Sequence, residues 1–379
     1  MAENTITGLI PDLYEALDVV SRELVGLIPA VTMNASAERA AKDTNIRVSV
    51  EPTGNGVDIT PAMAIPEPTG QTTGYTDIVI TKERAYEFGF VGNQQMALNA
   101  GVGYLNSRAG KIAQALRGLV NEVESDLAAL HSTFSRSYGT AATTPFGTAN
   151  DYTDASQVLK ILKDNGAPQS DNHLVINTSA GANFIGKQSA VNSAGTDSML
   201  RQGVLLDLAG MPLRESAQIK TPTKGTGANY TSSTAGFAVG VTTIALITGS
   251  GTILAGDSVT FTGDANKYIV TTALTGGNIV IAEPGLRQAI AASVVALTVV
   301  GTAAQNMCFN RSALVLAARA PAMPDEGDQA VDAIMLTDPR SGLTFEFSMY
   351  KGYKKVRYEV GLAWGVKNIK PEHTSILLG

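Results

Sequence analysis

The 379-residue sequence is poor in several features that mark particular classes of protein. It has a single cysteine, Cys308, so it can form neither an internal disulfide nor a cysteine-rich metal site. Charged residues make up 16% of the chain, compared with about 25% in an average globular domain. A surface with so little charge is usually covered by another molecule, and this composition favours an oligomer.

Long apolar runs and an excess of basic residues are also missing. No stretch approaches the run of about 20 apolar residues that crosses a membrane, and Met1–Asp12 has neither the basic nor the apolar part of a secretory signal. The formal net charge is -6, which argues against a general nucleic-acid binder. Hydrophobic residues still make up 44% of the chain, enough for a sizeable core and about two to three domains.

Hydrophobic periodicity predicts the elements of the N-terminal third. Apolar residues three and four positions apart predict one helix within 1–34, followed by a polar connection, and a stronger one over 104–134. Alternating segments at 46–50 and 75–81 predict an extended hairpin over 43–85, with three prolines near its tip. This hairpin has few side chains for a core of its own, so we expect it to lie on another molecule.

The remaining sequence changes character twice. Residues 153–219 predict an α/β unit, in which Ser179 caps a helix that follows a buried strand. Residues 220–303 carry few charges, and their short, evenly spaced strands with glycine turns predict a small β-barrel or sandwich. Because α/β-like sequence resumes with a predicted helix over 311–318, we interpret 220–303 as an inserted domain.

A search for catalytic patterns finds one candidate. Gly181 to Lys187 resembles a phosphate-binding loop after a strand, but Gln188 stands where that loop needs Ser or Thr for Mg²⁺. A capped helix after a strand explains the same residues without a ligand. The three histidines are far apart and none has the spacing of a metal-ligand pair, so we expect no catalytic residue, no cofactor and no metal.

One basic cluster, Lys351 to Arg357, mixes cations with Tyr353 and lies next to Tyr358. This mixture is compatible with a nucleic-acid contact. We favour the alternative, in which the charges mark a strand edge and discourage wrong pairing with other chains.

The order of these parts resembles that of the major capsid proteins of tailed bacteriophages with the Hong Kong 97-type fold. More narrowly, the sequence is similar to the coat proteins of short-tailed phages that carry an insertion domain. The strings that carry this resemblance are Gly256–Phe261, Asn278–Pro284, Met307–Leu316, Asp338–Leu343, Tyr358–Val366 and Ile369–Glu372.

The resemblance implies an α+β fold with an N-terminal arm, an extended β-hairpin loop, a long spine helix, peripheral and axial domains, and an inserted small β-barrel. The implied boundaries are 1–42 for the arm, 43–85 for the extended loop, 86–140 for the spine-helix region, 141–219 with 304–379 for the peripheral and axial domains, and 220–303 for the insertion. The loop would lie across a neighbouring subunit, with Val57, Ile59, Ile65 and Tyr75 as its candidate contacts.

The implied function is structural. Copies of the chain would form pentamers and hexamers of an icosahedral shell around double-stranded DNA, which would meet the inner face without sequence specificity. The implied partners are a scaffolding protein and a portal during assembly, and a decoration protein on the outside, with no membrane. The implied location is the virion, assembled in the cytoplasm of a host bacterium.

The sequence departs from some relatives in one respect. Those relatives crosslink a lysine of the extended loop to a neighbour, but no lysine occurs between Lys42 and Lys82 here, so we expect a noncovalent shell. Two alternatives remain: a phosphate- or nucleotide-binding α/β enzyme that uses Lys187, and a compartment shell of the same fold that encloses protein cargo.

Overall fold

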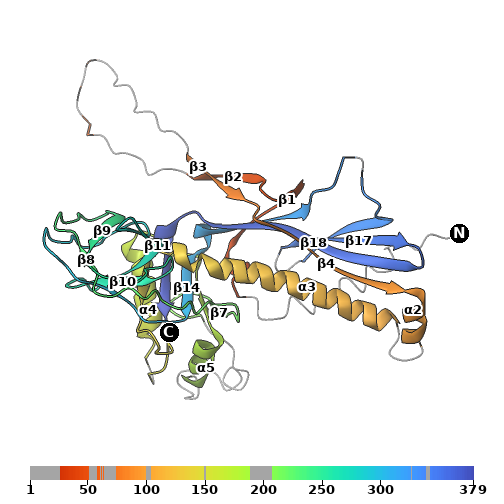
Figure 1. Ribbon diagram of the computed structural model, residues 1–379, viewed down its shortest axis with the longest axis horizontal. Helices are drawn as coiled ribbons and strands as arrows, with labels where there is room; N and C mark the ends of the chain where they lie inside the picture. Colours follow the sequence, from red (N-terminus) through yellow and green to blue (C-terminus); the bar gives the residue numbers. More distant parts are fainter. Residues whose placement is uncertain are drawn as a thin grey trace.

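The computed structural model describes residues 26–50, 58–59, 61, 63, 74–99, 104–148, 151–187, 207–325, 327–338 and 342–379. The molecule is elongated, with the helix α3 (Tyr104–Ala129) along its long axis and a sheet over that helix (Figure 1). A second sheet lies at one end, and the hairpin of β2 (Asn45–Val50) and β3 (Gly74–Val79) projects from the middle. Mixed sheets with few helices confirm the expected α+β class.

The first sheet has six strands, and β18 is its central strand. Its strands are β1 (Thr32–Ala40), β4 (Lys82–Val91), β15 (Leu314–Pro321), β16 (Asp332–Thr337), β17 (Thr344–Gly352) and β18 (Lys355–Asn368). β18 pairs with β15 and β17 along one edge and with the whole of β4 along the other, all antiparallel. β1 adds to β15 in parallel, so an early segment of the chain lies beside a late one.

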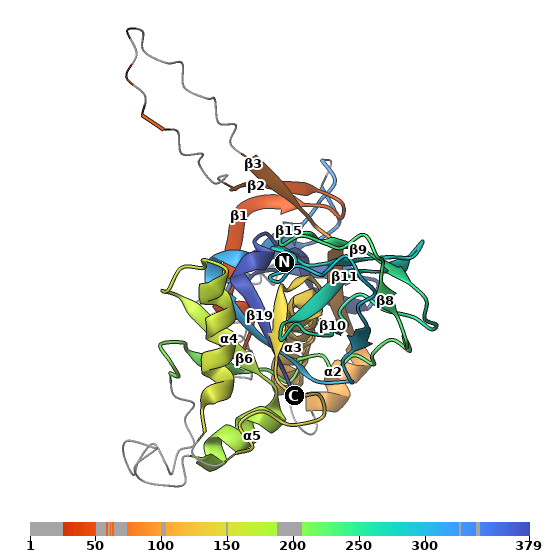
Figure 2. The same ribbon diagram turned by 90° about the vertical axis from the view of Figure 1, so that its left-hand side faces the viewer.

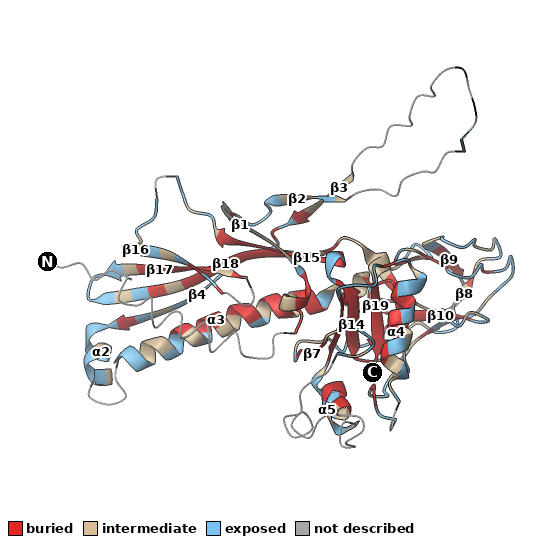
Figure 3. Cartoon of the chain, turned by 180° about the vertical axis from the view of Figure 1, so that it is seen from behind, coloured by how far each residue is buried: buried red, intermediate tan, exposed pale blue. Residues whose placement is uncertain are grey.

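Helix α3 covers one face of this sheet, after the short helix α2 (Gly92–Asn99). Its buried side chains recur every three or four residues, as one face of a helix requires: Ile112, Leu116, Leu119, Val123 and Leu127. They share one core with Trp364 of β18, which is fully buried. Figure 3 shows buried residues along both α3 and β18. At Gly118 an added Cβ would stand 2.7 Å from the ring of Tyr86, so this glycine allows helix and sheet to pack closely.

The second sheet, of eleven strands, combines two groups of elements. The first group comprises β5 (Arg136–Tyr138), β6 (Asn172–Ile176), β7 (Leu213–Glu215), β14 (Gln305–Asn310) and β19 (Thr374–Leu378). Helices α4 (Thr153–Asp164) and α5 (Thr178–Lys187) lie on this side of the molecule, and the second group lies on the other (Figure 2).

Residues 220–303 provide the second group. Its strands are β8 (Thr231–Ser232), β9 (Thr243–Ile247), β10 (Ser258–Phe261), β11 (Lys267–Thr275), β12 (Asn278–Ile281) and β13 (Leu297–Val299). Their hydrophobic core consists entirely of residues between Tyr230 and Val299. The unit is nevertheless continuous with the rest of the sheet, because Lys267 and Tyr268 of β11 pair with β5.

Short 3-10 turns complete the described chain, at Ile28–Ala30, Leu130–Thr133, Arg311–Ala313 and Pro371–His373. The first is tied to α3 by one buried carboxylate. Glu124 Oε1 accepts hydrogen bonds from the backbone N–H groups of Gly26 (2.8 Å) and Leu27 (2.6 Å), and Oε2 accepts one from Ile28 (3.0 Å). Burial raises the pKa of Glu124, although these N–H donors oppose that shift.

Three local predictions were wrong. Residues 311–318 form a 3-10 turn and the start of β15, which is buried between β1 and β18, and a strand buried on both faces lacks the alternation that distinguishes it from a helix. The connection expected near residue 34 is strand β1, while the helix predicted before it lies mostly in residues 1–25, outside the described part. Asn177, not Ser179, caps α5, because its Oδ1 accepts a hydrogen bond from the N–H of Ala180 (2.9 Å).

None of the helices in the described residues combines the length and the apolar character needed to cross a membrane.

Candidate assembly surfaces

The β2–β3 hairpin is anchored at its base. We call this hairpin the arm; it belongs to the segment 43–85 and is not the N-terminal arm of residues 1–42. Ile78 and Ile80 are fully buried, in a small core that they share with Val315 and Ala363. The N–H of Ile80 also donates to the carbonyl oxygen of Thr44 (3.0 Å), which closes the base of the arm. The base is therefore part of the subunit core and has a fixed direction.

Side chains also hold the arm in register. Lys367 Nζ donates to Thr76 Oγ1 (2.8 Å) and to the carbonyl oxygen of Asp77 (2.9 Å), which ties β18 to β3. Arg47 bridges the two arm strands, with Nε 3.1 Å from Asp77 Oδ1 and its guanidinium 3.9 Å from the ring centre of Tyr75. Such a cation–π contact on an exposed surface contributes about 0.5–1 kcal/mol.

The outer part of the arm exposes apolar side chains. Ile59 is 99% exposed and Tyr75 is 60% exposed, and Met63 is also fully exposed. The other two predicted contacts, Val57 and Ile65, lie outside the described residues. Burying one isoleucine contributes about 1.5–3 kcal/mol, so Ile59 and Met63 on a second molecule would stabilise an assembly considerably.

A second exposed feature is the turn between β17 and β18, which we call the tip (Lys351–Lys355). It lies near α2, at the end of the long axis that is remote from the second sheet (Figure 1). Tyr353 is 87% exposed, and Lys354 has a left-handed backbone conformation with φ of 55°. Within the described part of the chain, no ion pair involves Lys351, Lys354 or Lys355. The tip therefore presents three ammonium groups and an aromatic ring to solvent.

A small cleft of about 80 Å³ lies further back on the same sheet, beside the connection from β15 to β16. We call it the acidic cleft: it is lined by the carboxylates of Asp328, Glu346 and Glu359, by Arg39, and by the apolar segment 321–324. The two terminal guanidinium nitrogens of Arg39, Nη1 and Nη2, donate to Glu346 at 2.8 Å each, and this pairing raises the pKa of Arg39.

Asp328 has only neutral donors among the described residues. Its carboxylate accepts hydrogen bonds from the hydroxyl of Tyr350 (2.7 Å) and the N–H of Ala330 (2.7 Å). Burial, the hydrogen bond to Asp328 and the charge of Glu359 together raise the pKa of Tyr350 to about 12. The nearby guanidinium of Arg39 feels the charge of Asp328, but Arg39 is bound to Glu346, so Asp328 has no ion-pair partner of its own among the described residues.

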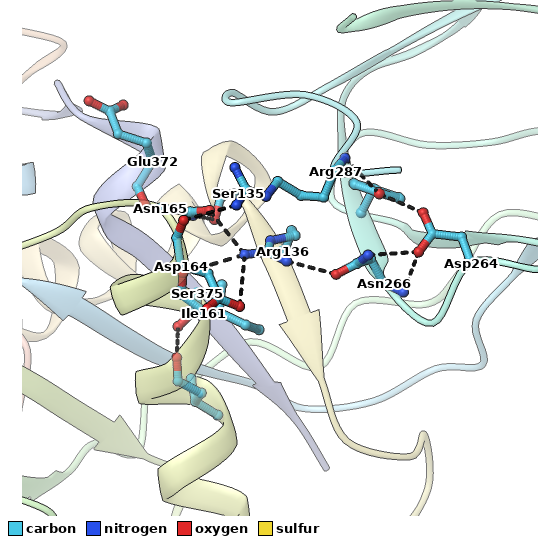
Figure 4. Close-up of polar contacts among 12 residues, drawn as sticks. Ser135, Arg136, Ile161, Asp164, Asn165, Asp264, Asn266, Arg287, Glu372 and Ser375 are labelled. Atoms are coloured by element: carbon cyan, nitrogen blue, oxygen red, sulfur yellow. Dashed lines mark hydrogen bonds and ion pairs between the residues drawn. The ribbon is translucent and has the colours of Figure 1, made fainter. Parts of the chain in front are cut away.

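Arg136 joins three parts of the molecule at a buried junction (Figure 4). From β5, its Nη1 donates to Asn266 Oδ1 (2.7 Å) of the 220–303 unit, and its Nη2 donates to Asn165 Oδ1 (3.0 Å) after α4. On the other side of Asn266, Asp264 accepts the hydroxyl of Tyr268 (2.6 Å), and Asn165 also donates to the carbonyl oxygen of Glu372 (2.8 Å). Such a connected network fixes the angle between these parts.

The residues considered for catalysis are not brought together. Gly181 to Lys187 lies within α5, so the N–H groups that a phosphate loop would offer are those of a helix interior. His131 follows α3, His173 is the second residue of β6, and no group of three metal-ligating side chains occurs in the described ranges. Burial raises the pKa of the Cys308 thiol to about 12, which keeps it protonated and unreactive.

The sequence singled out the basic residues of the tip but favoured a strand edge for them; this was wrong, because β18 is paired with β17 and β4 at Lys355 and Arg357, and the cluster forms a hairpin turn.

The sequence did not reveal the acidic cleft or the Arg136 junction. Asp325 and Asp328 lie close together in the sequence, whereas Glu346 and Glu359 lie on separate strands and meet only through the pairing of β17 with β18. No local pattern distinguishes Arg136 from a surface arginine.

Comparison with known proteins gives a structural likeness only. No family model matches the sequence, and no curated protein matches it. The chain is similar to the capsid of a native GTA particle (TM-score 0.46, 11% identity, covering 100% of this chain and 94% of that chain). It is also similar to the capsid of cyanophage P-SCSP1u (TM-score 0.45, 11% identity, 92% and 86%) and to a virus-like particle from Pyrococcus furiosus (TM-score 0.42, 11% identity, 97% and 99%).

The structural neighbours are thus capsid proteins of phages and related particles, as the sequence resemblance predicted. Because these TM-scores are below 0.5 and the identities are low, the likeness does not decide what the chain does. The function of the chain has to be inferred from its own surfaces.

Proposed function

We propose that the chain is the major capsid protein of a tailed bacteriophage, and that many copies of it close an icosahedral shell around double-stranded DNA. The arm carries this proposal. Its base is built into the subunit core, while Ile59, Met63 and Tyr75 extend into solvent. A rigidly anchored hairpin that exposes apolar side chains is suited to lie across a second copy.

In this proposal the parts of the chain take the roles of a Hong Kong 97-type subunit. The segment 43–85 is the extended loop, α3 is the spine, and the unit that contains α4 and α5 gathers around the five- and six-fold axes of pentamers and hexamers. Residues 220–303 form an inserted β-barrel on the outer surface. The separate core of that unit and the Arg136 junction that fixes its angle support this assignment.

The proposed partners follow from the same roles. A scaffolding protein and a portal take part in assembly in the host cytoplasm, and a decoration protein can bind the outside of the virion. The net charge of -6 suits an inner wall that must not hold packaged DNA tightly. The role needs no catalytic residue, cofactor or metal.

Electron microscopy of the purified full chain tests the proposal. Negative staining should show closed shells or flat hexameric sheets. Dispersed monomers at all concentrations would contradict it. Particles recovered from infected cells that contain protein cargo and no DNA would instead identify a compartment shell.

A further inference from the structure

We infer that the tip of one copy binds the acidic cleft of a second copy, with Lys354 placed against Asp328. The inference rests on the proposed function, because it requires copies to associate, and it goes beyond that function by naming two surfaces that meet.

The charges of the two surfaces are complementary. The tip carries three ammonium groups that have no ion-pair partner in the described residues. The acidic cleft has three carboxylates for one guanidinium among its lining residues. Glu346 is paired with Arg39 and Glu359 with Arg357, so Asp328 is the carboxylate of the cleft that has no ion-pair partner of its own, with only the long-range charge of Arg39 opposite it. An ammonium group from outside would supply that partner.

The apolar parts also correspond. On the tip, Tyr353 stands next to Lys354, and at the cleft the segment 321–324, with two prolines and a methionine, stands next to the carboxylates. A volume of about 80 Å³ admits the end of a lysine side chain but not a tyrosine ring. Lys354 would therefore enter the cleft, while the ring of Tyr353 would cover the apolar rim.

The tip cannot bind the acidic cleft of its own subunit. Tyr350 of the cleft and Tyr353 of the tip are three residues apart on one hairpin, about 10 Å in an extended strand. Strand pairing continues to the turn, at Lys351 with Val356 and Gly352 with Lys355, so the tip cannot fold back. Because donor and acceptor surfaces differ, each copy gives one contact and receives another, and such contacts close into rings or propagate.

Disulfide trapping tests the contact directly. In the full chain carrying Lys354→Cys and Asp328→Cys, mild oxidation of assembled particles should give a ladder of dimers, trimers and larger species on a non-reducing gel. Cys308 is fully buried, so it does not compete. Each single-cysteine variant is the matched control and should give no species beyond a dimer. Particles of the double variant that remain monomeric on the gel overturn the inference.

Charge reversal gives an independent readout. Lys354→Glu or Asp328→Lys should raise the protein concentration needed for assembly by about three- to tenfold, and the combined variant should return it towards the wild-type value. Lys160→Glu, on the exposed face of α4, makes the same charge change elsewhere and should leave that concentration unchanged.

The outcomes separate the two proposals. If particles form normally and both single variants behave like the wild type, or if the combined variant does not recover, the tip–cleft contact is wrong while the capsid role stands. If the wild-type chain forms no assembly at all, both are wrong.

Discussion

At the scale of single residues, the three histidines lie in surroundings that disfavour their charged form. Burial lowers the pKa of His131, His173 and His373 below the ordinary value of about 6.5. His131 Nδ1 donates a hydrogen bond to the carbonyl oxygen of Ala128 (3.0 Å), and its ring contributes to the packing beneath Gly256.

We predict that His131 makes the protein less stable as the pH falls below about 6.5. At these pH values the unfolded chain binds a proton at His131, whereas the buried ring of the folded chain resists protonation. The stability that is present above the pKa of His131 in the unfolded chain is therefore lost as the pH falls towards its lower pKa in the folded chain. Glu124 and Asp257 have raised pKa values and act in the opposite direction. The measurement therefore compares two variants: between pH 7.5 and 5.5 the melting temperature of the wild type should fall by more than that of His131→Gln. Equal losses would contradict the prediction.

Gly365 offers a second prediction at this scale. A Cβ added there would stand 2.0 Å from the carbonyl oxygen of Val79, where the end of β3 crosses β18. Because a backbone atom cannot move aside as a side chain can, Gly365→Ala should lower the free energy of unfolding by about 1–3 kcal/mol. Gly110→Ala in α3, where an added Cβ meets nothing within 4 Å, should raise it by up to about 1 kcal/mol. Urea unfolding of the two variants measures both values, and a Gly365→Ala variant as stable as the wild type would show that the crossing can relax.

At the scale of elements, the arm divides into a base that belongs to the fold and an outer part that does not. Ile59→Asp should change the free energy of unfolding by less than about 0.5 kcal/mol, because the side chain is already in water, but it should prevent closed shells. Ile78→Asp is the matched control at the base, and it should prevent folding, because it buries an unpaired charge. Melting curves and negative-stain images of both variants check this. Normal shells from Ile59→Asp would show that the arm does not bind a neighbour.

The 220–303 unit is a second part of the chain whose folding can be tested separately. We predict that it folds when expressed alone, because its hydrophobic core uses only its own residues. It should melt cooperatively at a lower temperature than the full chain, since β11 loses its pairing with β5. Dispersed amide signals and a cooperative melt are the expected observations. An unfolded fragment would mean that the pairing with β5 is essential.

Sequence patterns predicted most of these elements, and their failures have a common cause. α3, α4, β6 and the strands β9 to β12 follow a clear period or are bounded by turn residues, so local sequence determines them. β1 and β15 depend on each other, and their pairing lies in no local pattern. The same holds for the sites: an exposed arm can be inferred from prolines and few apolar residues, whereas the acidic cleft requires strand register.

At the scale of the whole assembly, we predict a shell without covalent bonds between subunits. Lys82, at the border of the lysine-free stretch 43–81, already has partners within its own subunit. Its Nζ lies 2.8 Å from Asp126 Oδ1 and over the ring of Trp364. Particles boiled in detergent with reductant should therefore run as monomers on a gel. A ladder of larger species under these conditions would disprove the prediction.

The parallel pairing of β1 with β15 has a consequence for synthesis on the ribosome. Thr32 pairs with Val315, so about 280 residues separate the two strands in the chain. At about 5–20 residues per second, β1 emerges roughly 15–55 s before its partner strand exists. Throughout that interval the first sheet is incomplete and the base of the arm has nothing to pack on. A half-made chain therefore cannot present the arm in its final direction, and this delays association between copies until translation is nearly finished.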